Sequence, residues 1–177
     1  KRGLLPPYEF IEIAEATNLI LPIGKWVVEE GLSAFKNIQD KVKSELSISF
    51  NVARRQMEHA EFLPALAASA VAQNIDPHNI HLEILERNLF MRGKMEEWIT
   101  ACAKHGFPVL LDDFGTGYSS LLYLQQFQVA KLKIDRSFIS GLPANKESRN
   151  ICKAIIDLAH AMHIGVIAEG IETREQA

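Results

Sequence analysis

The sequence predicts an α/β fold built on a parallel sheet. Apolar stretches with the length of strands occur at residues 46–52, 80–85, 109–114, 129–135 and 165–170. Segments with helical spacing of apolar residues lie between them, as in repeated strand–helix units. The strand stretches are nearly continuous apolar runs, which is typical of a parallel sheet buried on both faces. Parallel strands bring their carboxyl ends to one face, where α/β enzymes assemble their active sites.

Apolar periodicity, start residues and capping residues predict the helices. We expect them over about residues 8–17, 22–39, 64–73, 89–105, 119–126 and 146–163. Pro22 and Pro64 fit the first turns of their helices. Ser119 or Ser120 is a candidate cap for the short helix, and Asn145 is one for the last helix. Helix and strand then alternate along the chain without a linker or low-complexity tract, so we expect one domain.

Composition and charge narrow the class of protein. The chain has 177 residues, of which 47% are hydrophobic and 23% charged, as in an ordinary globular domain with a sizeable core. The net charge of −3 provides no basic field, which argues against duplex nucleic acid as a partner. No apolar run has the length of a membrane span, and no signal peptide opens the chain. We therefore expect a cytoplasmic domain, whose parent protein can still be anchored elsewhere.

Two cysteines and two tryptophans lie among apolar residues at helical positions. Cys102 and Cys152 show no pairing or metal-ligand spacing, so we expect buried free thiols, which fit a reducing compartment. Trp26 and Trp98 are expected in the core because their neighbours at helical spacing are apolar.

Polar residues stand at or near the end of every predicted strand, and this pattern is a functional signal. Carboxylate and carboxamide oxygens gathered on one face can hold hard divalent cations such as magnesium or manganese, and they argue against zinc. The residues at the strand ends are Asn51, Glu83, the pair Asp112 and Asp113, Lys133 with Asp135, and Glu169.

The segment LDDFGTGYSS, at residues 111–120, carries the strongest motif. Neighbouring carboxylates on a strand normally point to opposite faces. At a strand end both can reach one site, and Gly115 and Gly117 allow a positive φ there. A bare Asp-Asp pair is more often a tight strand-to-helix turn. The other polar strand ends favour a functional role for Asp112 and Asp113.

Five segments together resemble the EAL-type cyclic di-GMP phosphodiesterase domain. They are SFNVARRQ at 49–56, LEILE at 82–86, LDDFGTGYSS at 111–120, LKIDRSF at 132–138 and IAEGIET at 167–173. The resemblance runs in order along the whole chain. It implies a modified β/α (TIM-type) barrel, of which this chain covers about five strands. A β/α barrel needs eight strands, so we expect a partial domain over residues 1–177, truncated at both ends and inactive alone.

The resemblance also implies an activity and a set of residue roles. Cyclic di-GMP would be hydrolysed to linear pGpG with two magnesium or manganese ions, in bacterial signal transduction. Lys133, Glu169 and Asp113 would be catalytic, and Glu86 would brace the loop after Asp113. The expected metal ligands are Asn51, Glu83, Asp112, Asp113 and Glu169, and the expected substrate contacts are Arg55, Asp135 and Glu172. For Asp135, capping the loop after its strand is an equally good interpretation.

Calcium is expected to bind and inhibit, because its longer bonds would misplace the attacking water. The resemblance further implies neighbouring regulatory domains and allows a homodimer. The chain departs from the family at Ala53, Leu85 and Arg87, none of which replaces a ligand. The glutamate-alanine-leucine segment that names the family would lie upstream of Lys1.

Two other functions stay open. A catalytically inactive receptor of the same fold would bind cyclic di-GMP and pass a signal to a neighbouring domain. An unrelated metal-dependent barrel enzyme, of aldolase or enolase type, would need a substrate-binding set that the sequence does not reveal.

Overall fold

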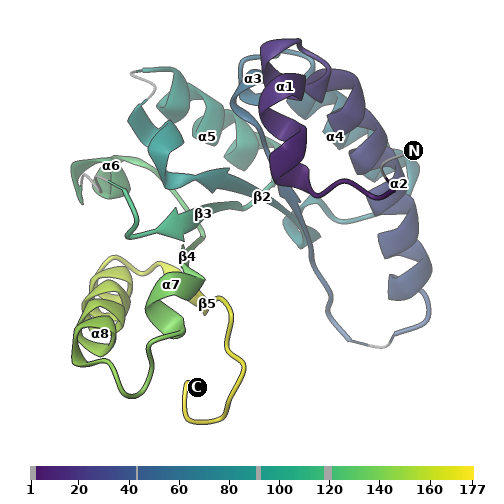
Figure 1. The fold of residues 1–177 in the computed structure, drawn as a ribbon. Helices are drawn as coiled ribbons and strands as arrows, with labels where there is room; N and C mark the ends of the chain where they lie inside the picture. Colours follow the sequence, from purple (N-terminus) through teal and green to yellow (C-terminus); the bar gives the residue numbers. More distant parts are fainter. Residues whose placement is uncertain (1–2, 43, 91–92, 118–120) are drawn as a thin grey trace. The chain divides into compact units, whose positions relative to one another are not determined.

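The computed structural model describes residues 3–42, 44–90, 93–117 and 121–177. Helices and strands alternate along most of the chain, as the α/β prediction requires (Figure 1). The chain divides into two compact units. The first comprises Lys1–His81 with His105–Phe107, and the second comprises Leu82–Lys104 with Pro108–Ala177.

In the described residues the strands form one sheet with the order β1-β2-β3-β4-β5. Every pairing from β2 to β5 is parallel. Neighbours in the sheet are therefore neighbours in the chain, as expected for repeated strand–helix units. The predicted α/β class with a parallel sheet is confirmed. The strands are β1 Ile48–Asn51, β2 Ile80–Leu85, β3 Val109–Phe114, β4 Lys131–Ile134 and β5 Gly165–Ala168.

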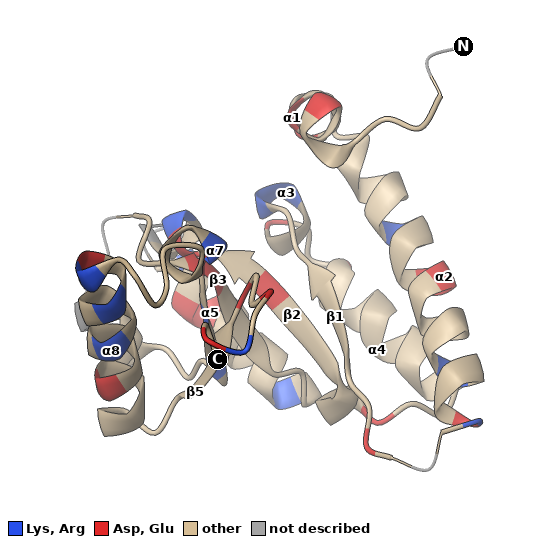
Figure 2. Cartoon of the chain, turned by 60° about the horizontal axis from the view of Figure 1, so that its bottom comes forward, with Lys and Arg blue, Asp and Glu red and all other residues tan. Residues whose placement is uncertain are grey.

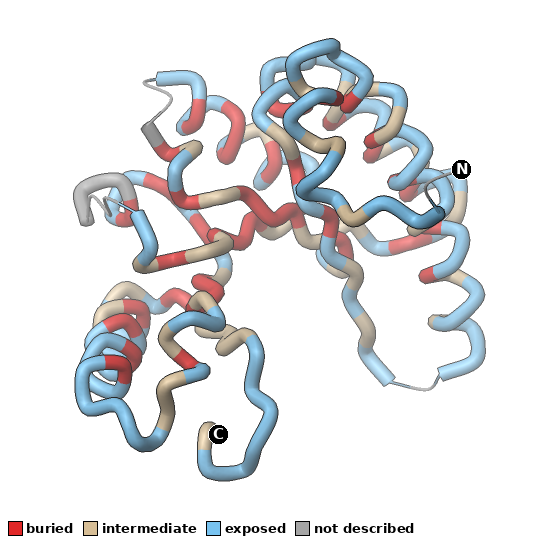
Figure 3. The backbone as a smooth tube through the Cα atoms, viewed as in Figure 1, coloured by how far each residue is buried: buried red, intermediate tan, exposed pale blue. Residues whose placement is uncertain are grey.

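The core of the second unit lies along its strands, where the buried colour is concentrated (Figure 3). Leu82, Leu111 and Leu132 are each fully buried. Leu111 of β3 pairs with Leu132 of β4, so their side chains lie on the same face and pack against each other. Covered strands of this kind explain the nearly continuous apolar runs in the sequence.

The first unit packs its longest helix through one apolar stripe. Its helical segments are η1 Pro7–Glu9, α1 Ile11–Ala16, α2 Ile20–Gln39, α3 Arg54–Met57, α4 Phe62–Ala72 and η2 Pro77–Asn79. On α2 the buried residues Gly24, Val28 and Leu32 recur every four positions, which gives one stripe along the helix. At Gly31, a Cβ atom would lie 2.7 Å from Cε1 of Phe50 on β1. Only glycine at this position therefore allows β1 to approach α2.

Trp26 on the same helix corrects one prediction. Its relative exposure is 61%, whereas Trp98 is buried at 8%. Trp26 falls outside the stripe of Gly24, Val28 and Leu32, so apolar neighbours in sequence did not place it in the core. Cys102 and Cys152 are buried free thiols as predicted. Burial raises the pKa of both thiols.

The second unit contains η3 Glu86–Phe90, α5 Lys94–His105, α6 Leu121–Gln126, α7 Arg136–Ile139 and α8 Lys146–Ala161. The expected helix over residues 89–105 is wrong at its start. Gly93 has a left-handed φ of +76°, and the helix begins only after it. The candidate caps Ser119 and Ser120 lie outside the described residues. None of the described helices combines the length and apolar character needed to cross a membrane.

Charged residues are distributed unevenly over these elements (Figure 2). Acidic colour falls on β2 and β3, whereas α2 and α8 carry residues of both signs. On α8, Lys153 and Asp157 form an ion pair of 2.6 Å one helical turn apart, and both side chains are exposed. Exposed pairs of this kind contribute little stability. The acidic residues Glu83 and Asp112 on the strands are instead largely buried, and buried charges of this kind indicate a site.

Asn145 begins α8 as predicted. Its Oδ1 accepts the N–H groups of Glu147 at 2.8 Å and Ser148 at 3.0 Å. Both groups would otherwise lack a partner at the helix start. We predict that Asn145→Ala lowers the free energy of unfolding by about 1 kcal/mol. Asn145→Asp keeps an accepting oxygen and should stay near the wild type. Urea unfolding followed by circular dichroism measures both; equal losses would contradict the capping role.

Candidate active site

One lysine holds the candidate site together. Nζ of Lys133, on β4, lies 2.7 Å from Oε2 of Glu83, 3.0 Å from Oδ1 of Asp112 and 2.7 Å from Oε1 of Glu169. Glu83 comes from β2, Asp112 from β3, and Glu169 directly follows β5. The structure therefore brings together four of the predicted site residues from four consecutive strands.

Sheet register explains why these side chains meet. Asp112 is paired with Leu85, which lies two residues beyond Glu83, so Glu83 and Asp112 share one face of the sheet. Lys133 pairs with Ile167, two residues before Glu169. Because side chains alternate along a strand and neighbouring strands are in register, all four charged groups project to the same side. The spacing in sequence thus becomes proximity in space.

Lys133 is only 8% exposed, and so is Glu83. Burial by itself would lower the pKa of the Lys133 ammonium. Its hydrogen bonds to Glu169, Glu83 and Asp112 outweigh burial and raise that pKa above the usual lysine range. Lys133 is therefore a permanent positive charge among carboxylates.

Asp113 departs from regular strand geometry. Its φ is +55°, a left-handed conformation that costs most L-residues free energy. The pairing of β3 with β4 is irregular between Leu111 and Phe114. The N–H of Asp113 donates to Oδ1 of Asp112 at 3.0 Å. This bend brings the Asp113 carboxylate near that of Asp112, although alternation alone would send them to opposite faces.

Burial raises the pKa of the Asp113 carboxyl, and the negative charges of Asp112, Asp135 and Glu169 raise it further. Lys133 acts in the opposite direction and offsets part of this effect. The ionised form of Asp113 is therefore destabilised by its surroundings, which is a common property of functional carboxylates.

The turn after Asp113 is fixed by a buried carboxylate. Oε2 of Glu86 accepts the N–H of Gly115 at 3.0 Å and the N–H of Gly117 at 3.4 Å. Gly115 has a φ of +95° as expected, whereas the second left-handed residue is Asp113, not Gly117. The Thr116 hydroxyl donates to the carbonyl oxygen of Asp113 at 2.8 Å. Thr116 was not predicted as a site residue, although a hydroxyl in a glycine-rich turn is a signal for such a bond.

Asp135 and Glu172 lie beyond the ends of β4 and β5. The Asp135 carboxylate accepts the N–H of Ser137 at 2.9 Å and caps α7. Hydrogen bonding to Ser137 lowers the pKa of Asp135. Its charge also reaches Asp113, so capping does not separate Asp135 from the site. Glu172 is exposed, and its N–H donates to Oε1 of Gln176 at 2.7 Å.

Asn51 and Arg55 belong to the first unit. Asn51 ends β1, as predicted. Arg55 lies on α3 and forms an ion pair of 3.4 Å with Glu58. Their assignments as metal ligand and substrate contact stay predictions.

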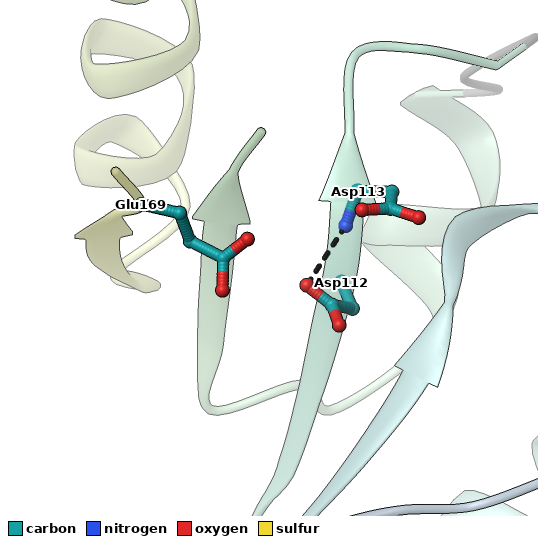
Figure 4. Close-up of side chains that lie close together, drawn as sticks. All are labelled: Asp112, Asp113 and Glu169. Atoms are coloured by element: carbon teal, nitrogen blue, oxygen red, sulfur yellow. Dashed lines mark hydrogen bonds between the residues drawn. The ribbon is translucent and has the colours of Figure 1, made fainter. Parts of the chain in front are cut away.

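Asp112, Asp113 and Glu169 can hold a metal ion together. Each offers an oxygen, and the three oxygens lie within 4.8 Å of one another. Figure 4 shows the Glu169 carboxylate pointing toward Asp112, with Asp113 bonded to Asp112 through its backbone. An all-oxygen set suits magnesium, manganese or calcium. With Lys133 beside it, this cluster could bind the cations and phosphate groups used in phosphoryl chemistry.

Comparison with known proteins defines the class. The EAL domain family model matches residues 1–177, and the chain belongs to this family. It is 34% identical over 174 residues to the signaling protein YkoW of Bacillus subtilis, covering 98% of this chain and 22% of that protein. It is 33% identical over 177 residues to the cyclic di-GMP phosphodiesterase PdeR of Escherichia coli, covering 99% of this chain and 27% of that protein.

The fold is that of solved EAL domains. A cyclic di-GMP complex of the PaMucR phosphodiesterase superposes with a TM-score of 0.91 at 32% identity, covering 99% of this chain and 72% of that one. The predicted TIM-type barrel class is therefore confirmed, with this chain providing a parallel sheet of five strands in the described residues. The chain spans about a quarter of the length of the two curated relatives.

The left-handed backbone of Asp113 generates a prediction about stability. Asparagine adopts this conformation more readily than alanine does. Asp113→Asn should therefore be more stable than Asp113→Ala by about 1 kcal/mol. Thermal melts of the two variants measure the difference, and equal stability would contradict the left-handed assignment.

The stability difference between Asp113→Asn and the wild type should depend on pH. Because the folded-state pKa of Asp113 is raised above its ordinary value, proton binding favours the folded state at low pH. That contribution is lost as the pH rises through the folded-state pKa. The gain in melting temperature of Asp113→Asn over the wild type should accordingly be larger at pH 7 than at pH 4.

Proposed function

We propose that the protein containing this chain hydrolyses cyclic di-GMP to linear pGpG with divalent cations, as part of bacterial signal transduction. The observation that carries the proposal is the Lys133 cluster, in which carboxylates from β2, from β3 and from the residue after β5 surround one ammonium. Membership of the EAL family and the naming of PdeR as a cyclic di-GMP phosphodiesterase support the choice of substrate.

We propose that the donor set holds two magnesium or manganese ions. We assign Asp112, Asp113 and Glu169 as ligands, since their oxygens lie within 4.8 Å of one another. Glu83 and Asn51 complete the proposed set with further oxygens. Bound divalent cations would supply positive charge that activates water and neutralises the phosphodiester. Zinc fits less well, because no histidine or cysteine belongs to this cluster.

Lys133 has two proposed tasks. It fixes the orientation of Glu83, Asp112 and Glu169 through its three short contacts. It also keeps its proton, since hydrogen bonds to these carboxylates raise its pKa. A protonated amine at this position can orient the attacking water or bind a phosphate oxygen, and it does so without gaining or losing a proton.

Other residues would shape the site. Glu86 holds the turn after Asp113 by accepting two backbone N–H groups, and this fixes the carboxylate pair. Arg55, Asp135 and Glu172 are the proposed substrate contacts. The Arg55 guanidinium can bind a phosphate, and the two carboxylates can accept hydrogen bonds from a guanine edge. Neighbouring regulatory domains and a homodimer stay predictions.

Asp112→Asn tests the proposal. The change keeps the size of the side chain but removes one charge from the ligand set, so kcat/KM for cyclic di-GMP should fall by about a hundredfold or more. Asp157→Asn is the matched control, because Asp157 is exposed on α8 and pairs with Lys153 of the same helix. Both variants are assayed in the full-length protein by chromatographic separation of cyclic di-GMP and pGpG. Near wild-type turnover by a folded Asp112→Asn variant would refute the ligand assignment.

Hydrolysis in the wild type also separates enzyme from receptor. An enzyme converts cyclic di-GMP in the presence of magnesium or manganese and stops when the metal is chelated. A protein that binds cyclic di-GMP without converting it under these conditions is a receptor, and the proposed activity is then wrong.

Calcium provides a further test. It binds oxygen at about 2.3–2.6 Å in loose geometry, against about 2.0–2.1 Å for magnesium. We predict that calcium supports cyclic di-GMP binding but not hydrolysis, and that excess magnesium relieves the block. Calorimetric binding and product formation are measured side by side with each metal. Comparable turnover with calcium alone would contradict the prediction.

A further inference from the structure

Helix α7 touches the segment that carries Glu169. Gly170, the next residue, has a left-handed φ of +71°, and a Cβ atom built on it would lie 2.8 Å from Cβ of Arg136. Cβ of Arg136 is bonded to the backbone, so no change of rotamer can move it away. Glycine is therefore required at position 170 for two reasons: its left-handed φ and the close approach of α7.

The same helix touches the turn that follows Asp113. A Cβ atom on Gly115 would lie 3.1 Å from Cε2 of Phe138 and 3.2 Å from Cδ1 of Ile155. Phe138 is part of α7, and Gly115 comes two residues after Asp113. One short helix thus contacts both acidic segments, one through Arg136 and the other through Phe138.

A cap, a backbone hydrogen bond, a buried side chain and packing against a neighbouring helix hold α7 in place. Asp135 caps its first turn by accepting the N–H of Ser137 at 2.9 Å. The N–H of Ser140 donates to the carbonyl of Arg136 at 2.8 Å, and Ile139 is buried at 2% exposure. The helix also packs against α8 (Figure 1). A four-residue helix secured at its start, its end and its inner face can act as a rigid spacer.

We propose that α7 sets the position of the Glu169 carboxylate relative to Asp112 and Asp113, with Gly170 and Arg136 as positioning residues. The catalytic role of these carboxylates rests on the function proposed above. The contact between Gly170 and Arg136 does not depend on that function. Any side chain at Gly170 would push its segment away from Arg136. Glu169 is the adjacent residue, so its contact of 2.7 Å with Lys133 would be lost.

Gly170→Ala introduces the clash, and Gly93→Ala is its matched control. Gly93 has a φ of +76° but no described atom within 4 Å of a built Cβ, so Gly93→Ala carries the backbone strain without a steric contact. Two double variants then isolate the Cβ of Arg136. Gly170→Ala with Arg136→Gly removes that atom, whereas Gly170→Ala with Arg136→Ala keeps it and removes the rest of the arginine side chain.

Crystal structures of the full-length protein without metal test the geometry. In Gly170→Ala the distance from Nζ of Lys133 to Oε1 of Glu169 should exceed about 4 Å, the limit of an ion pair. It should return to the wild-type value when Arg136→Gly is added, but not with Arg136→Ala. An unchanged distance in Gly170→Ala overturns the proposal, and so does equal recovery with both second changes.

Metal binding and kinetics test the consequence for the site. Manganese titration followed by electron paramagnetic resonance should show affinity about 10–100-fold weaker in Gly170→Ala, recovered only with Arg136→Gly. The loss in kcat should exceed the change in KM, since the substrate contacts proposed above are other residues. Wild-type affinity in Gly170→Ala overturns the proposal.

Folding of the variants is itself informative. If Gly170→Ala does not fold, the double variant with Arg136→Gly should fold, because the clash is relieved; failure of both contradicts the proposal. A wild type that binds cyclic di-GMP without hydrolysing it would refute the proposed function only. The distance between Lys133 and Glu169 in the variants still decides the positioning role.

Discussion

The arrangement of the site depends on the ammonium of Lys133. Glu83, Asp112 and Glu169 would repel one another at the distances that their common contact with Lys133 imposes, and the positive charge between them makes those distances tolerable. Removing ammonium from a buried cluster of this kind typically costs about 3–5 kcal/mol. The same charge keeps acidic groups from β2, from β3 and from the segment after β5 close together. Structural stability and the capacity to bind cations therefore rely on one interaction.

Much of this cluster could be predicted from the sequence because its members follow two simple regularities. A polar residue near the end of an apolar strand stands out, and parallel strands put such ends on one face. Because side chains alternate along each strand, the register places the side chains of Glu83, Asp112, Lys133 and Glu169 on the same side of the sheet. Asp113 could be predicted as a neighbour, but its left-handed backbone could not, because that conformation depends on how β3 leaves its pairing with β4.

The errors and omissions have physical causes as well. Trp26 was expected in the core because apolar residues surround it in sequence, yet burial on α2 follows one stripe of four-residue spacing. The α7 helix was not predicted, since four residues are too few to show a helical period. The contact of Gly170 with Arg136 joins residues 34 positions apart, so only the fold reveals that this glycine cannot carry a side chain.

Backbone strain and charge repulsion coincide at Asp113. Asp113 combines an unfavourable φ with a carboxyl whose ionised form is destabilised by burial and by its neighbours. Away from the site, the side-chain oxygen of Asn145 accepts the backbone N–H groups at the start of α8. This contrast is typical of proteins that trade local stability for a functional arrangement.

The neighbouring order of the strands has a consequence for biosynthesis. Because β2, β3, β4 and β5 follow one another in both chain and sheet, each strand can add to an edge that already exists as the chain leaves the ribosome. The pairing of β2 with β3 can precede the neutralisation of Glu83, since Lys133 is 50 residues beyond Glu83 in the chain. Until Lys133 emerges, Glu83 and Asp112 lack their shared counter-charge. A sheet formed before Lys133 is added therefore carries unbalanced negative charge at this face, which the lysine neutralises once β4 pairs with β3.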